Sequence, residues 1–188
     1  MEKIILASGS PRRQELLTQI GVPFEVRKSD AEELLNHADG PRALAMENAR
    51  RKALAVAKAY PHRLVLGADT VVFQDGDVYG KPKDAADACA MLRRFASRRH
   101  AVVTGVALVH HDGTCRTDAA ETKVFFSDLT DEEIAAYVAT GEPMDKAGAY
   151  AVQGRAAAFI PRIEGSFSNV VGLPLAEVVM LLKEAGAM

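Results

Sequence analysis

The stretch "HAVVTGVALVHHDGTCRTDAAETKVFF" (residues 100–126) decides the fold. It contains two long runs rich in β-branched and apolar residues, and the turn pair Asp112-Gly113 separates them. This pattern is typical of two antiparallel strands joined by a tight connection. Two strands alone are marginally stable in water, so the hairpin predicts a larger sheet built from the segments on either side of it.

Outward from this hairpin, the remaining segments alternate irregularly between strand and helix patterns. We predict strands at 3–7, at 63–73 with an interruption at Gly67-Ala68-Asp69, near 149–152 and at 157–163, and helices at 11–20, 41–60, 84–96, 130–141 and from Pro174 onward. The segment "QDGD" (74–77) predicts a hairpin turn. The mixture without strict alternation favours an α/β fold with a mixed sheet, and no linker divides residues 1–188, so we expect a single domain with two lobes.

Composition excludes several classes of protein. The 188 residues are 48% hydrophobic, with a formal net charge of −2, which gives no basic footprint for a stable nucleic-acid partner. No apolar run reaches the roughly 20 residues that a membrane span needs, and the apolar start is too short for a secretory signal. Cys89 and Cys115 lie far apart without a CxxC partner, which favours reduced thiols and a cytoplasmic protein.

The segment "LASGSPRRQELL" (6–17) breaks a local rule of helix chemistry. Ser10 suits the N-cap, but Arg12 and Arg13 follow where the helix dipole disfavours cations. A helix N-terminus beside arginines is a ready site for a phosphate, so the break indicates a functional site. The alternative is that both arginines are solvated or paired with a carboxylate such as Glu15. On the helix dipole alone, removal of Arg13 should leave stability level or raise it slightly.

Asp69 in "LGADTVV" (66–72) and Lys81 in "YGKPKD" (79–84) form a second group of candidates. A carboxylate at a strand end suits metal binding or general-base work, whereas an aspartate that bonds its own turn is the alternative. The lysine lies on a stiff turn that is not a phosphate loop, because a proline replaces the expected Ser/Thr. Lys52 in "ARRKALAV" (49–56) is one of three adjacent cations, and a solvated helix face is its plain interpretation.

Small residues dominate "DKAGAYAVQG" (145–154) and "GSFSNVVGLPL" (165–175). They permit close approach of the backbone to a flat or extended ligand. Gln153 has an amide donor and an acceptor, which suit the edge of a nucleotide base. Tight turns in a packed core are the alternative, and the residues alone leave both open.

Taken together, the motifs resemble those of the Maf proteins. The matching segments occur in the same order and span nearly the whole chain: "LASGSPRRQELL", "AEE" (31–33), "RRKALAV", "LGADTVV", "GKP", "HAVVTGVAL", "DKAGAYAVQG" and "GSFSNVVGLPL". The last two motifs resemble the branch of dTTP/UTP pyrophosphatases. The resemblance implies an elongated mixed sheet with flanking helices, similar to the inosine triphosphate pyrophosphatases, in which two lobes enclose a nucleotide cleft.

The resemblance also implies a reaction and a set of residues. The reaction is metal-assisted hydrolysis of a nucleoside triphosphate to the monophosphate and pyrophosphate, with Mg²⁺, or alternatively Mn²⁺ or Co²⁺. The implied catalytic residues are Asp69, Glu33, Lys52 and Lys81, of which Asp69 and Glu33 hold the metal. The implied substrate-binding residues are Ser8, Ser10, Arg12, Arg13, Thr70 and Gln153. Such chemistry depends on positioning and charge neutralisation, so no histidine is assigned to it.

Other functions stay open at this point. The chain could be a regulator of cell division that binds a nucleotide without cleaving it, or a pyrophosphatase for 7-methyl-GTP. A nucleic-acid-binding module is a further alternative, which the acidic net charge and 6% aromatic content disfavour. The family resemblance suggests removal of non-standard nucleotides ("house-cleaning"), a link to septum formation, and a homodimer.

Overall fold

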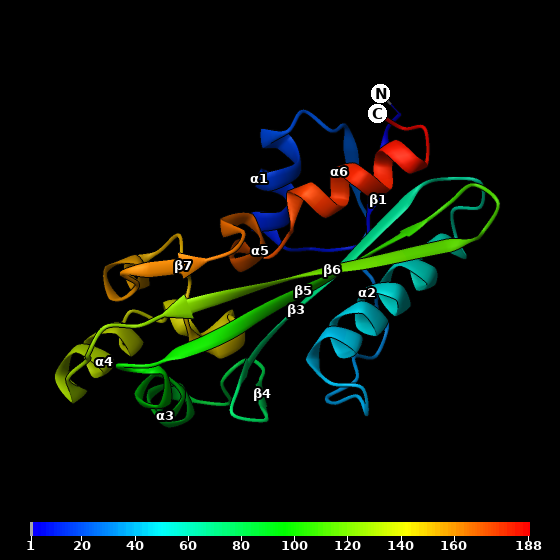
Figure 1. Ribbon diagram of the computed structural model, residues 1–188. Helices are drawn as coiled ribbons and strands as arrows, with labels where there is room; N and C mark the ends of the chain where they lie inside the picture. Colours follow the sequence, from blue (N-terminus) through cyan, green and yellow to red (C-terminus); the bar gives the residue numbers. More distant parts are fainter. Residues whose placement is uncertain (1) are drawn as a thin grey trace.

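A computed structural model describes residues 2–188 and contains a mixed sheet of seven strands in this part of the chain (Figure 1). The strands are β1 (Ile4–Leu6), β2 (Phe24–Val26), β3 (Val65–Gln74), β4 (Asp77–Tyr79), β5 (Arg99–Val109), β6 (Cys115–Phe125) and β7 (Arg162–Glu164). Their order is β2-β1-β3-β5-β6-β7, and β4 pairs with β3 off this path. Strand β1 is parallel to both neighbours and the other pairs are antiparallel, so the prediction of a mixed sheet is confirmed.

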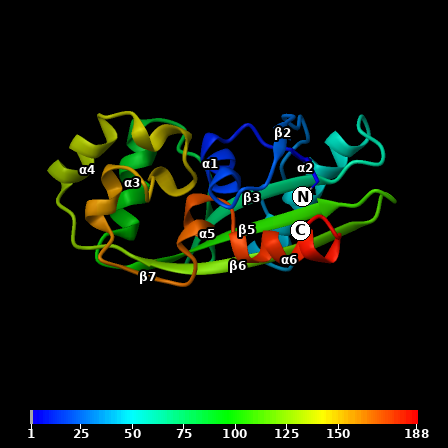
Figure 2. The same ribbon diagram turned by 90° about the horizontal axis from the view of Figure 1, so that it is seen from above.

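Helices cover the sheet in two groups. The α-helices are α1 (Pro11–Gln19), α2 (Pro41–Ala57), α3 (Ala85–Phe95), α4 (Asp131–Val138), α5 (Phe167–Val171) and α6 (Leu175–Glu184), and short 3₁₀ turns lie at η1 (Glu142–Asp145), η2 (Ala147–Ala149) and η3 (Arg155–Phe159). Helix α2 lies on one face of the long strands, and α1, α5 and α6 lie on the opposite face (Figure 1). Figure 2 shows α3 and α4 gathered at one end of the elongated sheet, α1 and α5 near its middle and α2 toward the other end.

The predicted long hairpin joins these two ends. Strands β5 and β6 pair from Arg99↔Phe125 to Val109↔Cys115 without a break. Strand β3 pairs along the other side of β5 for nine residues. The three long strands therefore run the length of the sheet, and the helices at both of its ends pack against them. This matches the expected two-lobed arrangement.

Two glycines bring α2 unusually close to this floor. A Cβ atom on Gly67 of β3 would lie 2.3 Å from the Ala49 carbonyl oxygen, and one on Gly105 of β5 would lie 2.3 Å from the Ala45 carbonyl carbon. The predicted interruption of the strand at residues 67–69 is wrong, because Gly67 here permits helix packing rather than a turn. Asp69 consequently lies inside a continuous strand and not at a strand end.

Other predicted elements are confirmed or corrected. The hairpin at 74–77 and the helices at 11–20, 41–60, 84–96, 130–141 and after Pro174 are present, with shifts of a few residues at their ends. The strand predicted at 149–152 is wrong, and in the segment predicted at 157–163 residues 157–159 end η3 and residues 162–163 begin the short β7. These residues use local turns instead: the Gly154 N–H donates to the Ala151 carbonyl oxygen and the Ala157 N–H to that of Gly154. The sequence analysis also missed β2 and α5.

Among residues 2–188, no helix combines the length and the apolar character that crossing a membrane requires.

Candidate functional site

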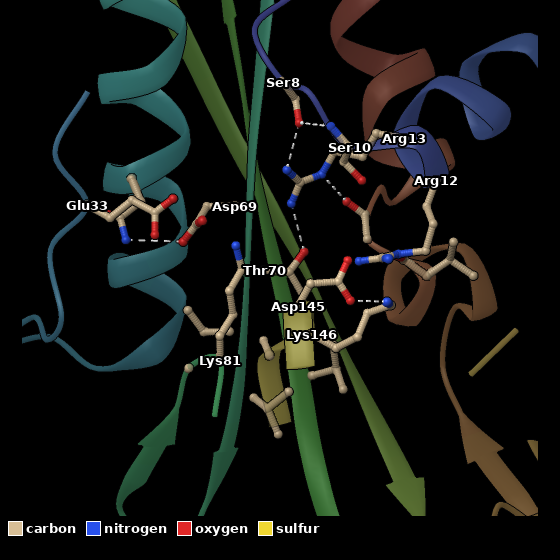
Figure 3. A pocket seen from close by; sticks show the side chains of 18 of the residues that line it. Ser8, Ser10, Arg12, Arg13, Glu33, Asp69, Thr70, Lys81, Asp145 and Lys146 are labelled. Carbon is tan, nitrogen blue, oxygen red and sulfur yellow. Dashed lines mark hydrogen bonds and ion pairs between the residues drawn. The ribbon is translucent and has the colours of Figure 1, made fainter. Parts of the chain in front are cut away.

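A cleft of about 780 Å³ is lined by residues of β3, β4, α1, α2, α5 and the loops near them, and all ten residues named from the sequence line it. They are Ser8, Ser10, Arg12, Arg13, Glu33, Lys52, Asp69, Thr70, Lys81 and Gln153. Figure 3 shows Glu33 and Asp69 on one side of the cleft and Arg12 on the other, with Thr70 between them. The sequence therefore predicted which residues the fold brings together.

The cleft is basic although the chain is acidic. Six cationic side chains line it against three carboxylates, namely Arg12, Arg13, Lys28, Lys52, Lys81 and Lys146 against Glu33, Asp69 and Asp145. The whole chain has a net charge of −2. A concave surface with an excess of one charge concentrates ligands of the opposite charge. The cleft thus suits a ligand with several negative charges.

Lys52 occupies the centre of the carboxylate side. Its Nζ lies 2.7 Å from Asp69 Oδ1 and 2.6 Å from Glu33 Oε1, and its side chain is only 13% exposed. The interpretation of Lys52 as part of a solvated face is therefore wrong. The turn interpretation of Asp69 is also wrong, because its carboxylate bonds the side chains of α2 and not its own backbone.

Asn48 is a site residue that the sequence analysis missed. Its Nδ2 donates to Asp69 Oδ2 at 3.1 Å and to the Leu34 carbonyl oxygen at 3.0 Å, and its Oδ1 accepts the Leu34 N–H at 2.8 Å. The amide thus fixes both the aspartate and the loop that contains Glu33. Its spacing of four residues from Lys52 places both side chains on one face of α2, and this spacing could have identified it.

The Glu33 carboxylate is kept ionised by its cationic neighbours. Burial raises its pKa, but the hydrogen bond from Lys52, and the charges of Lys52, Lys81 and Arg13, together outweigh burial and lower the pKa below the usual value. Glu33 is therefore anionic at neutral pH and available as an oxygen ligand.

Arg13 is held by three hydrogen bonds and does not point into water. Its Nε donates to the Gly172 carbonyl oxygen at 2.8 Å, Nη1 to Ser8 Oγ at 3.1 Å and Nη2 to Thr70 Oγ1 at 3.1 Å. Desolvation lowers the pKa of Arg13, and the charge of Asp69 partly offsets this effect. The interpretation of Arg13 as a solvated side chain is wrong.

The carbonyl groups at the end of α5 resolve the broken helix rule. Arg12 Nε donates to the Val171 carbonyl oxygen at 3.3 Å, next to the Gly172 carbonyl that accepts from Arg13. Carbonyl groups at a helix C-terminus lack partners in the helix and attract cations. The end of α5 therefore compensates for the unfavourable position of both arginines at the start of α1.

The two serines leave hydroxyl protons for a ligand. Ser8 Oγ accepts from Arg13 Nη1 at 3.1 Å and from the Ser10 N–H at 3.3 Å. A hydroxyl oxygen has two acceptor positions and one donor, so Ser8 keeps only its O–H. Ser10 is the N-cap residue of α1, as predicted, but its side chain makes no capping bond to the helix. Both hydroxyls line the cleft beside the start of α1.

Gln153 lies at the tip of the turn formed by Ala151–Gly154. Its side chain is exposed and lines the cleft. Two groups behind the cleft hold the turn: Tyr137 Oη accepts the Ala151 N–H at 3.2 Å, and Glu142 Oε1 accepts the N–H that follows Gly154 at 3.2 Å. The interpretation of this segment as a tight turn in a packed core is therefore correct for the residues that hold the turn. It is wrong for Gln153, which lines the cleft.

The loop that contains Lys81 is joined to the loop of residues 145–149. The Gly148 N–H donates to the Gly80 carbonyl oxygen at 3.1 Å, and an ion pair links Asp145 with Lys146. The hydrogen bond from Lys146 lowers the pKa of Asp145. Neither charged residue was predicted from the sequence, because only the small residues and Gln153 of this motif were singled out there.

The carboxylate side fits a divalent cation. Glu33 and Asp69 present oxygen atoms on either side of a positive group, the Lys52 ammonium. Within residues 2–188, no cluster of three or more His, Cys, Asp or Glu side chains could hold a metal by itself. Mg²⁺ is commonly held by one or two carboxylates together with substrate phosphates, so this donor set suits a metal that arrives with a phosphorylated ligand.

Comparisons with solved structures agree with the fold. The structure of the Staphylococcus aureus Ham1 protein aligns with a TM-score of 0.57 at 16% identity, over 97% of this chain and 99% of that chain. The structure of a HAM1 protein from Coxiella burnetii aligns with a TM-score of 0.52 at 13% identity, over 98% of this chain and 100% of that chain. The predicted α/β architecture, an elongated mixed sheet with flanking helices, is confirmed.

Sequence comparisons give the family. The chain is 54% identical to a dTTP/UTP pyrophosphatase of Symbiobacterium thermophilum over 99% of this chain and 95% of the relative. It is 52% identical to a dTTP/UTP pyrophosphatase of Geobacter sulfurreducens over 100% of both chains. The model of the family described as "Maf-like protein" matches residues 3–185. With nearly every residue covered by that match, the chain belongs to the Maf family.

Proposed function

We propose that this protein hydrolyses dTTP and UTP to the nucleoside monophosphate and pyrophosphate. The observation that carries the proposal is the bridge of Lys52 between Glu33 and Asp69 inside a cation-lined cleft. Relatives that are 54% and 52% identical over nearly their whole length are named dTTP/UTP pyrophosphatases, which supports the same substrates here.

The phosphates would lie beside the start of α1. Arg13, Lys52 and Lys81 supply positive charge there, and the hydroxyls of Ser8 and Ser10 supply donors. Because a triphosphate has about four negative charges, neutralisation and in-line positioning are the main requirements of the reaction. Arg13 reaches the cleft with its geometry already fixed by three bonds, so little reorganisation is needed when the ligand binds.

Asp69 is the proposed general base. It would orient a water molecule and accept a proton from it as the water oxygen bonds to the α-phosphorus. At the same time the bond between the α-phosphorus and the pyrophosphate oxygen would break, and pyrophosphate would leave with that electron pair. Glu33 and Asp69 would hold a divalent cation, Mg²⁺ or alternatively Mn²⁺ or Co²⁺. When bound, such an ion neutralises phosphate charge. Lys52 keeps both carboxylates in place from the side of α2.

Base selection is assigned to Gln153, helped by Thr70 and Arg12, which line the same cleft. Uracil and thymine present an acceptor, a donor and an acceptor along one edge. Cytosine replaces one acceptor with an amino donor and the central donor with an acceptor. An amide held on a fixed turn can match the first pattern and leaves buried groups unpaired with the second, at about 1–3 kcal/mol for each mismatch.

The two unpaired cysteines favour a cytoplasmic location. A house-cleaning role, a link to septum formation and a homodimer are part of the same proposal and rest on membership of the family. A regulator that binds nucleotide without cleaving it is the main alternative, and a pyrophosphatase for 7-methyl-GTP is the second. Binding alone does not call for a buried aspartate between a lysine and an amide, which favours catalysis.

The test is pyrophosphate release from a panel of triphosphates with Mg²⁺, for the protein and for its Asp69→Asn variant. We expect dTTP and UTP to be the best substrates and the variant to lose about 10²–10⁴-fold in turnover. Tight binding of nucleotide without release of pyrophosphate would support the regulator instead. A preference for 7-methyl-GTP would overturn the assignment of the pyrimidine substrates.

A further inference from the structure

Thr104 is a buried residue of β5 that lies directly opposite Thr70 in the antiparallel β3–β5 pair. Its side chain is 0% exposed and is not part of the cleft lining. Thr104 Oγ1 lies 2.9 Å from Thr70 Oγ1 and 3.1 Å from the carbonyl oxygen of Asn169. The hydroxyl thus links a cleft residue to the backbone of α5, in a motif to which the proposed reaction assigns no role.

These contacts fix the direction of two protons. A carbonyl oxygen can only accept, so the bond to Asn169 uses the single proton of Thr104. The bond between the two threonines must then use the proton of Thr70. The hydroxyl of Thr70 therefore points its proton toward Thr104 on the neighbouring strand β5.

The Asn169 carbonyl oxygen, which is the last acceptor in this chain of two hydrogen bonds, is held in place by further contacts. Asn169 is 0% exposed, and its Nδ2 donates to the Val102 carbonyl oxygen at 3.0 Å and to Thr122 Oγ1 at 2.9 Å. The Asn169 backbone N–H is also bonded, to the Ser166 hydroxyl at 3.2 Å. The carbonyl oxygen of Asn169 cannot turn away without breaking these bonds. The fold therefore fixes the direction of both hydrogen bonds, from Thr70 to Thr104 and from Thr104 to Asn169.

Thr70 is left with a single function toward a ligand. One lone pair of Oγ1 accepts from Arg13 Nη2 at 3.1 Å, and the proton goes to Thr104. What remains is one acceptor position, and because Thr70 lines the cleft, this position is the one open to a ligand. A ligand group opposite this oxygen must be a donor, because another acceptor would meet it with lone pair against lone pair.

We propose that Thr104 is a positioning residue for base selection, which makes Thr70 an obligate acceptor and so favours a pyrimidine with an N3–H group. Uracil and thymine have this donor, whereas N3 of cytosine is an acceptor. The inference rests on the proposed dTTP/UTP activity. It states that the Thr70 hydroxyl acts toward the base as a hydrogen-bond acceptor and not as a donor. Thr104 acts through Thr70 and does not touch the substrate.

The experiment measures kcat/KM for UTP and CTP on the same preparations of wild type, Thr104→Val and Thr104→Ser. Valine keeps the shape but removes the acceptor, so the Thr70 hydroxyl becomes free to turn and donate. We expect the UTP to CTP ratio to fall about tenfold in Thr104→Val, with a lower KM for CTP and a higher KM for UTP. Serine keeps the hydroxyl and should keep the wild-type ratio.

A comparison within each preparation removes the effect of partial unfolding, because both substrates then share one population of folded enzyme. In a Thr70→Val background, Thr104→Val should cause no further change in the ratio. Equal losses on UTP and CTP in Thr104→Val, or the same loss of ratio in Thr104→Ser, would overturn the inference. If the wild type itself hydrolyses neither substrate or does not prefer UTP, the proposed function has failed and not only the role of Thr104.

Discussion

Lys52 of α2 places its ammonium 2.7 Å from Oδ1 of Asp69 on β3, and both side chains are largely buried, at 13% and 9% exposure. The two residues meet because Gly67, two positions before the aspartate, lets the helix backbone approach the strand. Close packing of α2 and the charge arrangement of the cleft are thus one feature. A change at either end should affect both stability and activity.

Replacement of Lys52 with methionine should demonstrate this coupling. The variant leaves the Asp69 carboxylate buried without its cation, which should lower the free energy of unfolding by about 3 kcal/mol. Turnover should fall about 100-fold, because the carboxylates lose the group that positions them. Added Mg²⁺ should raise the melting temperature of this variant more than that of wild type, since a cation can then lie between the two carboxylates.

The matched control is Arg51→Met on the same helix. Arg51 pairs with Glu47 at the surface, with its side chain 40% exposed, so its removal should change stability by less than about 1 kcal/mol. Equal effects of the two substitutions, measured by urea denaturation, would show that Lys52 has no special part in the site.

Truncation of Arg13 to alanine should now lower stability, contrary to the expectation from the helix dipole alone. Three acceptors, on Gly172, Ser8 and Thr70, lose their donor, which should cost about 2 kcal/mol. KM should rise and kcat should fall together, because in the proposed complex the Arg13 guanidinium would also face the phosphates. Arg13→Lys keeps a positive charge but not the planar guanidinium with its several N–H donors, so it should restore little of the lost stability or activity. An unchanged or higher melting temperature of Arg13→Ala would show that the three bonds contribute nothing.

The sequence predicted the members of the site better than it predicted their surroundings. Short motifs mark both Arg13 and Asp69: Arg13 is a cation at a helix start, where the dipole disfavours it, and Asp69 is a carboxylate that the sequence predicts at the end of an apolar strand. What compensates for each break comes from distant segments: Asn48 lies 21 residues from Asp69, and Gly172 lies 159 residues from Arg13. The motifs around Asp69 and Arg13 do not themselves indicate these partners, and only the spacing of Asn48 from Lys52 on α2 gives a sign of one of them.

The errors in the fold have a similar cause. Gly67 was interpreted as a strand interruption, although its reason is the backbone of α2 above it. Residues 149–152 have the apolar composition of a strand, but their N–H groups bond a tyrosine side chain and nearby turns. In both places a tertiary contact overrides the local preference.

His100 should make stability fall in mild acid. Burial lowers its pKa from 6.5 to about 3. Below pH 6.5 the unfolded chain therefore binds a proton that the folded protein does not, so stability is lost as the pH falls from 6.5 toward 3. Between pH 7.5 and 5.0 the loss from this residue should be about 2 kcal/mol.

Urea denaturation at both pH values checks this contribution. His100→Gln cannot titrate, so its stability difference between pH 7.5 and 5.0 should be smaller than that of wild type by about 2 kcal/mol. Tyr150→Phe removes the hydroxyl that lies 2.7 Å from His100 Nε2 but keeps the imidazole, so its pH dependence should stay. The same pH dependence in His100→Gln and wild type would contradict the argument.

Gly105→Ala should displace α2 from the sheet. The added Cβ would lie 2.3–2.4 Å from backbone atoms of Ala45 and Met46, which cannot move without the helix. We expect a loss of about 1–3 kcal/mol, as for other overpacked interiors, and a fall in kcat because α2 also holds Lys52. Gly80→Ala, where the new Cβ meets open space, should leave stability unchanged. A melting temperature equal to wild type in Gly105→Ala would show that α2 adjusts freely.

Gln153→Ala tests whether base selection depends on the turn at Ala151–Gly154. The amide is the side-chain group at the tip of this turn, and Tyr137 and Glu142 hold the turn from behind. If the amide pairs with the edge of uracil, its loss should lower kcat/KM for UTP about tenfold and for CTP much less, so that the two substrates become more alike. Tyr137→Phe removes only the oxygen that accepts the Ala151 N–H and should cause a smaller change in the same direction, because the turn loosens but the amide remains. Equal losses on both substrates in Gln153→Ala would mean that this residue shapes the cleft without reading the base.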